Sequence, residues 1–222
     1  MKNFYILVGP PGSGKGTQAQ KISKKYNLTI LSPGALLRDQ IKSRTKIGKL
    51  AEPFVLAGEL VPNEIFLPKL LQILKQSRKS LLLDGFPRTI EQYKILSDFE
   101  KENEKCKLFV FEIDVSTRKL QERVGGRWHC HCGEIFHTKY RPSKRAGICD
   151  ICQQKLFRRS DEKPDILRNR LLIYRKKTSR IIRLFEGEHS DGYFLVNGDK
   201  NIDDVNKQFA KIFKKIHGLD KR

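Results

Sequence analysis

The sequence Gly9-Pro10-Pro11-Gly12-Ser13-Gly14-Lys15-Gly16-Thr17 follows a short apolar run at residues 4–8 and precedes a helical stretch at 18–26. Glycines in such a loop let backbone N–H groups converge on a phosphate, and the N-terminus of the helix adds positive potential. Lys15 can then reach the outer phosphates of a nucleotide, so the pattern predicts a P-loop rather than a plain glycine-rich turn. Gly16 follows Lys15, which displaces the magnesium-binding hydroxyl by one place, to Thr17.

Short apolar runs that predict strands occur at residues 4–8, 28–31, 81–83, 108–113 and 193–196. Each run is nearly continuous, which is typical of strands buried on both faces of a parallel sheet. Helical patterns separate the runs, and the last pattern has Asn201 as its candidate N-cap and Gly218 as its stop. Strands that alternate with helices predict a doubly wound, five-stranded parallel sheet of the α/β class, with ligands at the carboxyl ends of the strands.

Two segments interrupt this alternation, and we expect both to be insertions in one main domain. The stretch 32–79 has helical periodicity that Pro53, Gly58, Pro62 and Pro68 are expected to break, and we interpret its first part, 32–61, as a helical subdomain. Residues 125–163 have few apolar runs and contain most of the cysteines, which indicates a small lid pinned by a metal. The core domain would then comprise 1–31, 62–124 and 164–222.

A second motif, Asp84-Gly85-Phe86-Pro87-Arg88-Thr89, follows the apolar run at 81–83. A carboxylate at a strand end beside a P-loop can hold magnesium, directly or through water, so Asp84 and Thr17 are the candidate magnesium shell. Gly85 and Pro87 bend the chain so that Arg88 can turn toward the site. Two motifs aligned at strand ends favour a binding site over a turn with a surface ion pair.

A cysteine cluster falls in the predicted lid and consists of Cys130, Cys132, Cys149 and Cys152. Clustering in a chain without a secretion signal favours a metal site over disulfides, and the spacing from the second cysteine onward is typical of structural zinc. Only His131 separates the first two cysteines, so either Cys130 or His129 can be the fourth ligand. Free thiols are the alternative. Cys106 stands alone, and we expect it to be an inert core thiol.

The composition is that of a soluble, basic protein of 222 residues, with 45 Lys and Arg against 25 Asp and Glu and a formal net charge of +20. This excess favours polyanionic partners such as nucleic acid, a membrane surface or nucleotide phosphates, and it is equally consistent with a solvated basic surface. No apolar stretch approaches the ~18 residues of a membrane helix, and the opening run is too short for a signal peptide. We therefore expect a cytoplasmic protein with no membrane partner.

Further motifs follow in order along the chain: Gln92 after the Asp84 motif, then Glu122-Arg123, Gly126-Arg127, Arg159-Ser160-Asp161-Glu162 and Arg170-Leu171. Together with the P-loop, they resemble the long, lid-bearing form of adenylate kinase over nearly the whole chain. The resemblance implies reversible phosphoryl transfer from MgATP to AMP, giving two ADP, by a monomer with no nucleic-acid partner. It also implies Mg²⁺ as a cofactor with ATP and a structural Zn²⁺ in the lid.

The resemblance assigns residues to each nucleotide. On the ATP side it implies Gly12, Ser13, Gly14, Lys15, Gly16, Thr17, Arg123, Arg127, Ile135, Phe136 and Lys200. On the AMP side it implies Pro33, Arg38, Glu59, Leu60, Val61, Gly85, Phe86, Pro87, Arg88, Gln92, Arg159 and Arg170. Transfer between two phosphorylated nucleotides gathers negative charge, so the expected catalytic set is cationic: Lys15, Arg88, Arg123, Arg127, Arg159 and Arg170. Arg158 and Arg168 are the weaker rivals of Arg159 and Arg170.

The base pocket favours AMP, because the Gln92 amide carries a donor and an acceptor that can read the edge of adenine. Kinases for UMP, CMP or GMP are the alternatives within the same class. Before Arg38 the chain departs from the family pattern: Pro33 removes a hydroxyl and a backbone donor near AMP, and Ala35 removes a carboxylate that could order water around magnesium. Ser32 followed by Pro33 is still a good helix start.

A nucleic-acid-binding module is a hypothesis of a different class. It is built on the zinc-ribbon spacing, the net charge, and Trp128, Phe136 and Tyr140 as candidate stacking groups. The P-loop and Asp84 argue against it, because a binding ribbon needs neither.

Overall fold

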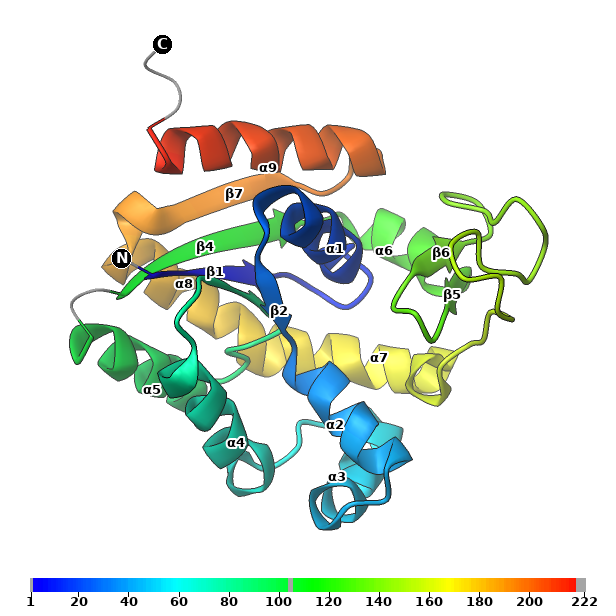
Figure 1. The fold of residues 1–222 in the computed structure, drawn as a ribbon, viewed down its shortest axis with the longest axis horizontal. Helices are drawn as coiled ribbons and strands as arrows, with labels where there is room; N and C mark the ends of the chain where they lie inside the picture. The colour runs from blue at the N-terminus through cyan, green and yellow to red at the C-terminus, as the bar shows by residue number, and fades with distance from the viewer. Residues whose placement is uncertain (1, 104–105, 219–222) are drawn as a thin grey trace.

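The computed structural model describes residues 2–103 and 106–218 (Figure 1). Within them, a central sheet has five parallel strands in the order β2-β3-β1-β4-β7. The strands are β1 Lys2–Val8, β2 Thr29–Leu31, β3 Leu81–Asp84, β4 Cys106–Asp114 and β7 Tyr193–Asn197. The predicted doubly wound α/β fold is confirmed, because each of the five expected runs forms one strand of this sheet.

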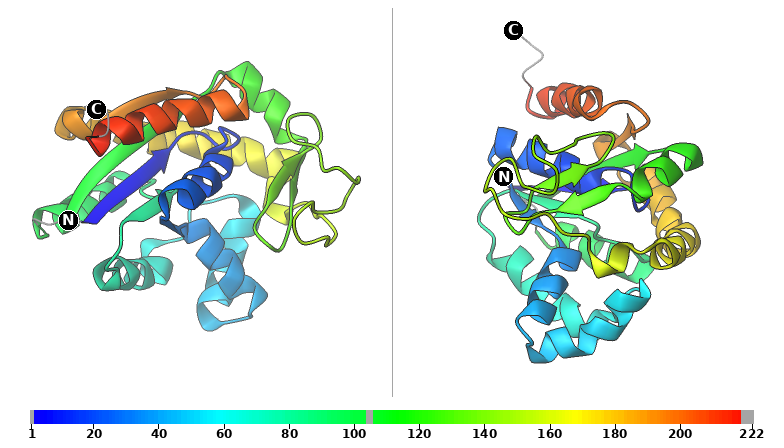
Figure 2. Two further views of the ribbon diagram at one scale, coloured as in Figure 1. Left: turned by 45° about the horizontal axis from the view of Figure 1, so that its top comes forward. Right: turned by 90° about the vertical axis from the view of Figure 1, so that its right-hand side faces the viewer.

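Helices cover both faces of the sheet, as the continuous apolar runs predict. Along β1, Phe4 and Ile6 pack with helices α4 Asn63–Gln76, α5 Ile90–Lys101 and α8 Ser179–Glu188, whereas Tyr5 and Leu7 pack with α1 Lys15–Tyr26 and α9 Ile202–Ile216. Successive side chains of a strand point to opposite faces, so one short run fills two cores. Figure 2 shows the sheet between these two sets of helices.

The edge strands depart from the expectation of burial on both faces. Thr29 and Ile30 of β2 are exposed, and Leu195 of β7 is 62% exposed. An edge strand has a neighbour on one side only, so the helices that cover the central strands do not fully cover it. The prediction of strands is confirmed, but the expected burial holds only in part: Leu31 and Val196 are buried, whereas Thr29, Ile30 and Leu195 are exposed.

The first insertion consists of two helices, α2 Pro33–Lys42 and α3 Lys46–Ala57. Their shared core is Leu37, Ala51 and Val61, separate from the two cores of the sheet. The expected breaks at two prolines are wrong, because Pro53 lies inside α3 and Pro68 lies inside α4. A proline removes one backbone donor, and the packing of the surrounding turns offsets that cost.

The helix boundaries come instead from caps and turns. α2 and α3 are separated at Arg44, which has φ 53°, and the Thr45 side chain caps α3 by accepting a hydrogen bond from the Gly48 N–H. Ser32 is the N-cap residue of α2, as predicted, but its side chain makes no cap hydrogen bond. At the last helix, Asn201 caps α9 by accepting from the Asp204 N–H, and Gly218 follows with φ 67°.

The second insertion follows α6 Thr117–Val124 and contains the antiparallel strands β5 Arg127–His129 and β6 Ile135–His137. It has its own small core, in which Phe136 packs with Cys130 and Cys149. The chain returns through η1 Ser160–Glu162 to α7 Pro164–Ile173, η2 Tyr174–Thr178 and α8, and then through η3 Ser190–Gly192 to β7. Among the described residues, no helix is long and apolar enough to cross a lipid bilayer.

Both insertions contact the rest of the protein near the carboxyl ends of the strands. In the lid, Glu134 pairs with Lys24 of α1 at 3.1 Å, and the Gly133 carbonyl accepts a hydrogen bond from Gln20. In the first insertion, the Ala57 carbonyl accepts from Asn169 of α7 at 2.9 Å. The insertions therefore lie on either side of the P-loop end of the sheet (Figure 1).

Candidate active site

The carboxyl ends of the central strands meet at one large cavity. β1 and β3 are in parallel register with Leu7 opposite Asp84, so the loops that follow the two strands leave the sheet side by side. The cavity has a volume of about 590 Å³, and residues of the P-loop, both insertions and α7 line it. This is the position where open α/β sheets bind ligands.

The P-loop needs glycine where the backbone turns tightly. Gly9 has φ 151°, and a Cβ added there would lie 2.7 Å from the Ile113 carbonyl oxygen and 2.9 Å from Ser13 Oγ. Gly14, with φ 93°, occupies the N-cap position of α1. The loop therefore exposes backbone N–H groups at a helix N-terminus, which is an arrangement that binds phosphate.

The Lys15 side chain is held against the P-loop by hydrogen bonds to backbone carbonyl groups of the loop. Its Nζ donates to Gly9 O at 2.6 Å and to Pro10 O at 2.9 Å. Burial lowers the pKa of Lys15 to about 7; Asp84 opposes this shift, and neighbouring arginines such as Arg88 add to it. At this pKa, Lys15 is only partly protonated at neutral pH. A nearby anion favours the protonated form, so phosphate binding would raise the pKa of Lys15 again.

Asp84 and Thr17 line the same cavity, where the magnesium shell is expected. A Cβ added to Gly16 would lie 4.0 Å from Asp84 Oδ2 and 3.2 Å from Ile135 Cδ1. Glycine after Lys15 therefore lets the lid residue Ile135 approach the P-loop closely. A carboxylate and a hydroxyl are hard oxygen donors, so the two residues fit magnesium chemically.

Three arginines gather around Asp161. Asp161 is buried and pairs with Arg159, with Arg170 at 3.4 Å and with Arg38 at 3.9 Å. Burial alone would raise the pKa of Asp161, but the hydrogen bond from Arg159 and the nearby positive charges outweigh it, so that pKa lies below its usual range. One carboxylate thus holds three cations together.

The neighbouring acid, Glu162, bonds one arginine and one histidine. Its Oε1 accepts from Arg127 Nη1 at 2.8 Å, and its Oε2 lies 2.9 Å from His129 Nε2. Although burial opposes ionisation, these partners hold the pKa of Glu162 far below its usual range. Burial also lowers the pKa of Arg38 and of Arg170 to about 10, so both stay charged at neutral pH but are poorly hydrated.

A second, smaller cavity of about 80 Å³ opens beside the first. The residues expected on the AMP side that line it are Pro33, Arg38, Glu59, Leu60, Val61, Gly85, Phe86, Arg88, Gln92 and Arg170; Pro87 and Arg159 line the larger cavity. Three arginines, Arg38, Arg88 and Arg170, line both cavities. They therefore lie where the phosphates of two neighbouring ligands would meet.

Gln92 is engaged at both ends of its amide. Its Oε1 accepts from the Arg88 N–H at 2.8 Å, and its Nε2 donates to Asn63 Oδ1 at 2.8 Å. Since an amide has two N–H groups and two lone pairs, one donor and one acceptor site remain for a ligand. Phe86 is buried, lines this smaller cavity and packs in the core with residues of α4 and α5.

Four residues expected on the ATP side lie outside both cavity linings: Ser13, which is buried, and Arg123, Phe136 and Lys200. Arg123 donates to Gly198 O at 2.8 Å and to Lys200 O at 3.3 Å, because the last turn of α6 faces the loop after β7. Phe136 is 2% exposed in the lid core, because alternation along β6 turns it away from the face of Ile135. Lys200 is exposed. These side chains contact other parts of the protein or solvent in this structure.

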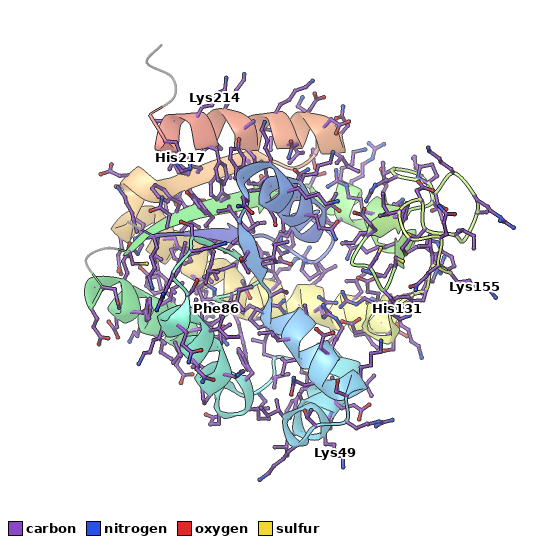
Figure 3. The ribbon with its side chains drawn as sticks, in the orientation of Figure 1. Lys49, Phe86, His131, Lys155, Lys214 and His217 are labelled. Atoms are coloured by element: carbon purple, nitrogen blue, oxygen red, sulfur yellow. The ribbon has the colours of Figure 1, made fainter. Side chains whose placement is uncertain are left out.

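The structure distinguishes Arg159 and Arg170 from their sequence alternatives, Arg158 and Arg168. Arg158 lies over the Trp128 ring with 4.8 Å to its centroid, whereas Arg159 lines the large cavity. Arg168 is exposed and pairs loosely with Asp165 at 3.8 Å, whereas Arg170 lines both cavities. Surface lysines such as Lys49, Lys155 and Lys214 project outward from the insertions and α9 (Figure 3).

The four clustered cysteines of the lid face one another. Their Sγ atoms all lie within 4.8 Å of one another, with Cys130 to Cys152 at 3.2 Å and Cys132 to Cys149 at 3.6 Å. Tetrahedral zinc with bonds of about 2.3 Å needs sulfurs roughly 3.8 Å apart, so the donor set fits that ion. His129 instead contacts Glu162. Cys106 is buried, and burial raises its pKa to about 11, which agrees with an inert thiol.

Four residues that the sequence did not single out contact candidate site residues: Asp161, Glu162, Asn63 and Thr178. The two acids were quoted within the Arg159 motif, and their position beside an arginine was a usable signal. Asn63 and Thr178 carry no such signal, because their partners are distant in sequence.

The fold and this site define a P-loop protein built for phosphorylated ligands. A family model described as adenylate kinase matches residues 7–190. The chain is 37% identical to an adenylate kinase of Methanosarcina barkeri over 95% of its length and 98% of that protein. It is 40% identical to one of Methanococcoides burtonii over 81% and 85%, and 33% identical to one of Thermococcus kodakarensis over 98% and 96%. The chain belongs to the adenylate kinase family.

Proposed function

We propose that the protein catalyses reversible transfer of the γ-phosphoryl group of MgATP to AMP, giving two ADP. The observation that carries this proposal is the pair of adjoining cavities that share Arg38, Arg88 and Arg170. One cavity contains a P-loop, which suits the phosphates of a donor nucleotide, and the other contains the base-reading candidate Gln92. Two anionic ligands placed there would present their phosphates to the same arginines.

The chemistry requires positioning and charge stabilisation more than covalent help, since the acceptor phosphate is already anionic at neutral pH. Lys15 and Arg127 would hold the donor phosphates, and the three shared arginines would bind the charge between the two nucleotides. Asp84 and Thr17 would hold Mg²⁺, which supplies charge neutralisation on the donor phosphates. In the free protein, Asp161 and Glu162 pair with these arginines, and phosphate oxygens would compete for the same donors.

We also propose that residues 32–61 and 125–163 act as flaps on a core made of 1–31, 62–124 and 164–222. The separate apolar clusters of the two insertions support this division. The lid contact from Glu134 to Lys24 and the contact from Ala57 to Asn169 support closure around the site. Closed flaps would exclude the water that could otherwise accept the phosphoryl group.

For the lid we propose one structural Zn²⁺ bound by Cys130, Cys132, Cys149 and Cys152. The mutual distances of the four sulfurs support it, and so does the small size of the lid core, because small domains commonly need a metal for stability. His129 is excluded from the proposed ligand set by its contact with Glu162. A closed four-ligand site has no open position, so the ion would take no part in the transfer.

The nucleic-acid alternative receives little support from the lid aromatics. Phe136 is buried, the Tyr140 hydroxyl donates to Glu122 at 2.7 Å, and Arg158 covers Trp128. Side chains with partners inside the protein form a poor stacking platform. We accordingly propose a monomer whose partners are ATP, AMP and ADP.

The deciding experiment offers purified protein MgATP together with AMP, UMP, CMP or GMP and measures diphosphate formation by chromatography. The proposal expects AMP to be the preferred acceptor. If another monophosphate is used as fast as AMP or faster, the preference for AMP is wrong. If no monophosphate is phosphorylated, the proposed activity is refuted.

A further inference from the structure

Arg88 is held by contacts from two parts of the chain that are far apart in sequence. Its N–H donates to Gln92, and its Nε donates to Gly85 O at 2.8 Å, both within its own segment. Its carbonyl group accepts from Thr178 Oγ1 at 3.0 Å, across 90 positions of sequence. Thr178 is 6% exposed, so this hydroxyl is shielded from water.

Thr178 ends a π-helical turn in an otherwise α-helical run. The turn is η2, and it joins α7 to α8 (Figure 1). In a regular α-helix, residues four apart drift by roughly 40° around the axis at each step. A π-turn takes one more residue per hydrogen-bonded turn and so reverses this drift. Arg170, Tyr174 and Thr178, at successive intervals of four, accordingly all line the large cavity.

We propose that Thr178 is a positioning residue that holds Arg88 between the two nucleotide sites. The proposal rests on the phosphoryl transfer proposed above. Arg88 lies in the irregular segment between β3 and α5, where no sheet or helix ladder fixes its carbonyl group. It also lines both cavities, so a small rotation of its backbone would move its guanidinium relative to both ligands.

A charged group between two phosphorylated ligands needs a defined direction. Burial lowers the pKa of Arg88 while Asp84 opposes that shift, so the guanidinium is desolvated and interacts strongly with whatever faces it. Transfer of a phosphoryl group is sensitive to sub-ångström placement of such donors. A hydroxyl fixed on a rigid helix supplies the placement that the loop lacks, and the π-turn brings that hydroxyl to the correct face.

The test compares Thr178→Val, which keeps the β-branched shape and removes the donor, with Thr178→Ser, which keeps the donor. We expect the valine variant to lose about 3- to 10-fold in kcat/KM for AMP, the size typical of one neutral hydrogen bond, with the KM for ATP changed less than about twofold. The serine variant should stay close to the wild type. Loss of activity in both variants alike, or in neither, would overturn the proposal.

A matched control is Ser179→Ala. Ser179 Oγ also donates to a backbone carbonyl, that of Arg175 at 2.6 Å, but this bond spans only four residues of the same helical run, and the half-buried Ser179 lines neither cavity. This variant should retain wild-type kinetics. If Thr178→Val does not fold, Thr178→Ala and Thr178→Ser differ by the hydroxyl alone and give the same comparison.

A double-mutant cycle separates positioning from a general structural role. In an Arg88→Ala background, Thr178→Val should have less than about a twofold further effect on kcat/KM, because the group it positions is already gone. Full additivity would show that Thr178 acts elsewhere. Inactive wild-type protein would refute the proposed function itself, whereas an active wild type matched by Thr178→Val would refute only the positioning role.

Discussion

His129 Nε2 lies 2.9 Å from Glu162 Oε2, so the histidine beside the cysteine cluster bonds an acid of the active site and stays out of the sulfur cluster. The other oxygen of that carboxylate accepts from Arg127 at 2.8 Å. The lid therefore contains two separate polar groups: the cluster of four cysteine sulfurs, and Glu162 with Arg127 and His129.

This separation predicts how zinc responds to single substitutions. Cys130→Ser should weaken zinc binding and lower the melting temperature, because it removes one of four thiolate ligands. His129→Asn should keep about one zinc per chain. The measurement is metal analysis of freshly purified, reduced protein, followed by thermal denaturation with and without a chelator. Zinc lost from the His129 variant and kept by the Cys130 variant would reverse the ligand assignment.

Lys15→Ala should reduce turnover by about 100-fold or more, the loss seen when one preorganised donor is removed from an active site. Its amino group bonds only to the loop itself among the contacts described, so the fold should survive. Circular dichroism and turnover should be measured together. Lys25→Ala, an exposed lysine of the same helix, is the matched control. Near-normal turnover of the Lys15 variant would remove the P-loop from the reaction.

Arg88→Ala should raise the KM for AMP about tenfold or more and change ATP binding less, since Arg88 lines both cavities but bonds Gln92, which lines only the smaller one. Initial rates with each substrate varied in turn give the comparison. Arg183→Ala, an exposed arginine of α8, should leave both values unchanged. An equal loss for both nucleotides would mean that the two sites are misassigned.

Acid should destabilise the protein through Asp161 and Glu162. The pKa of each lies below its ordinary value in the folded protein, so the unfolded chain binds more protons as pH falls below about 4.5. The two carboxylates stabilise the folded protein fully above that pH. This contribution is lost as the pH falls toward their pKa values in the folded state. Urea unfolding across pH 3–7 should show this slope, and Glu162→Gln should reduce it. An unchanged slope in that variant would contradict the account.

Local sequence signals predicted most of the fold because its elements are bounded by local chemistry. Asn201 capped α9 as expected, and the glycines of the P-loop stand where the backbone needs them. Pro53 misled the prediction, because tertiary packing decides whether one missing hydrogen bond ends a helix. The direction of the Phe136 side chain depended on the register of a short strand, which the sequence alone does not define.

In the candidate site, too, local sequence indicated some residues, whereas long-range packing decides the placement of others. Lys15 and Asp84 lie beside turns that their own neighbours create, so the sequence indicated them directly. Arg123 was predicted from a motif, but its side chain bonds the loop after β7, because long-range packing sets the direction of an arginine. The contact of Thr178 with Arg88 spans 90 positions and depends on a π-turn, which has no sequence signature that we used.

The most direct test of the two-site account counts products in a single mixture. Protein is incubated with MgATP, with and without AMP, and ATP, ADP, AMP and inorganic phosphate are quantified by chromatography. The account predicts two ADP formed for each ATP consumed, no inorganic phosphate, and no reaction without AMP. ADP and inorganic phosphate appearing at the same rate whether or not AMP is present would contradict it, because the phosphoryl group would then be going to water.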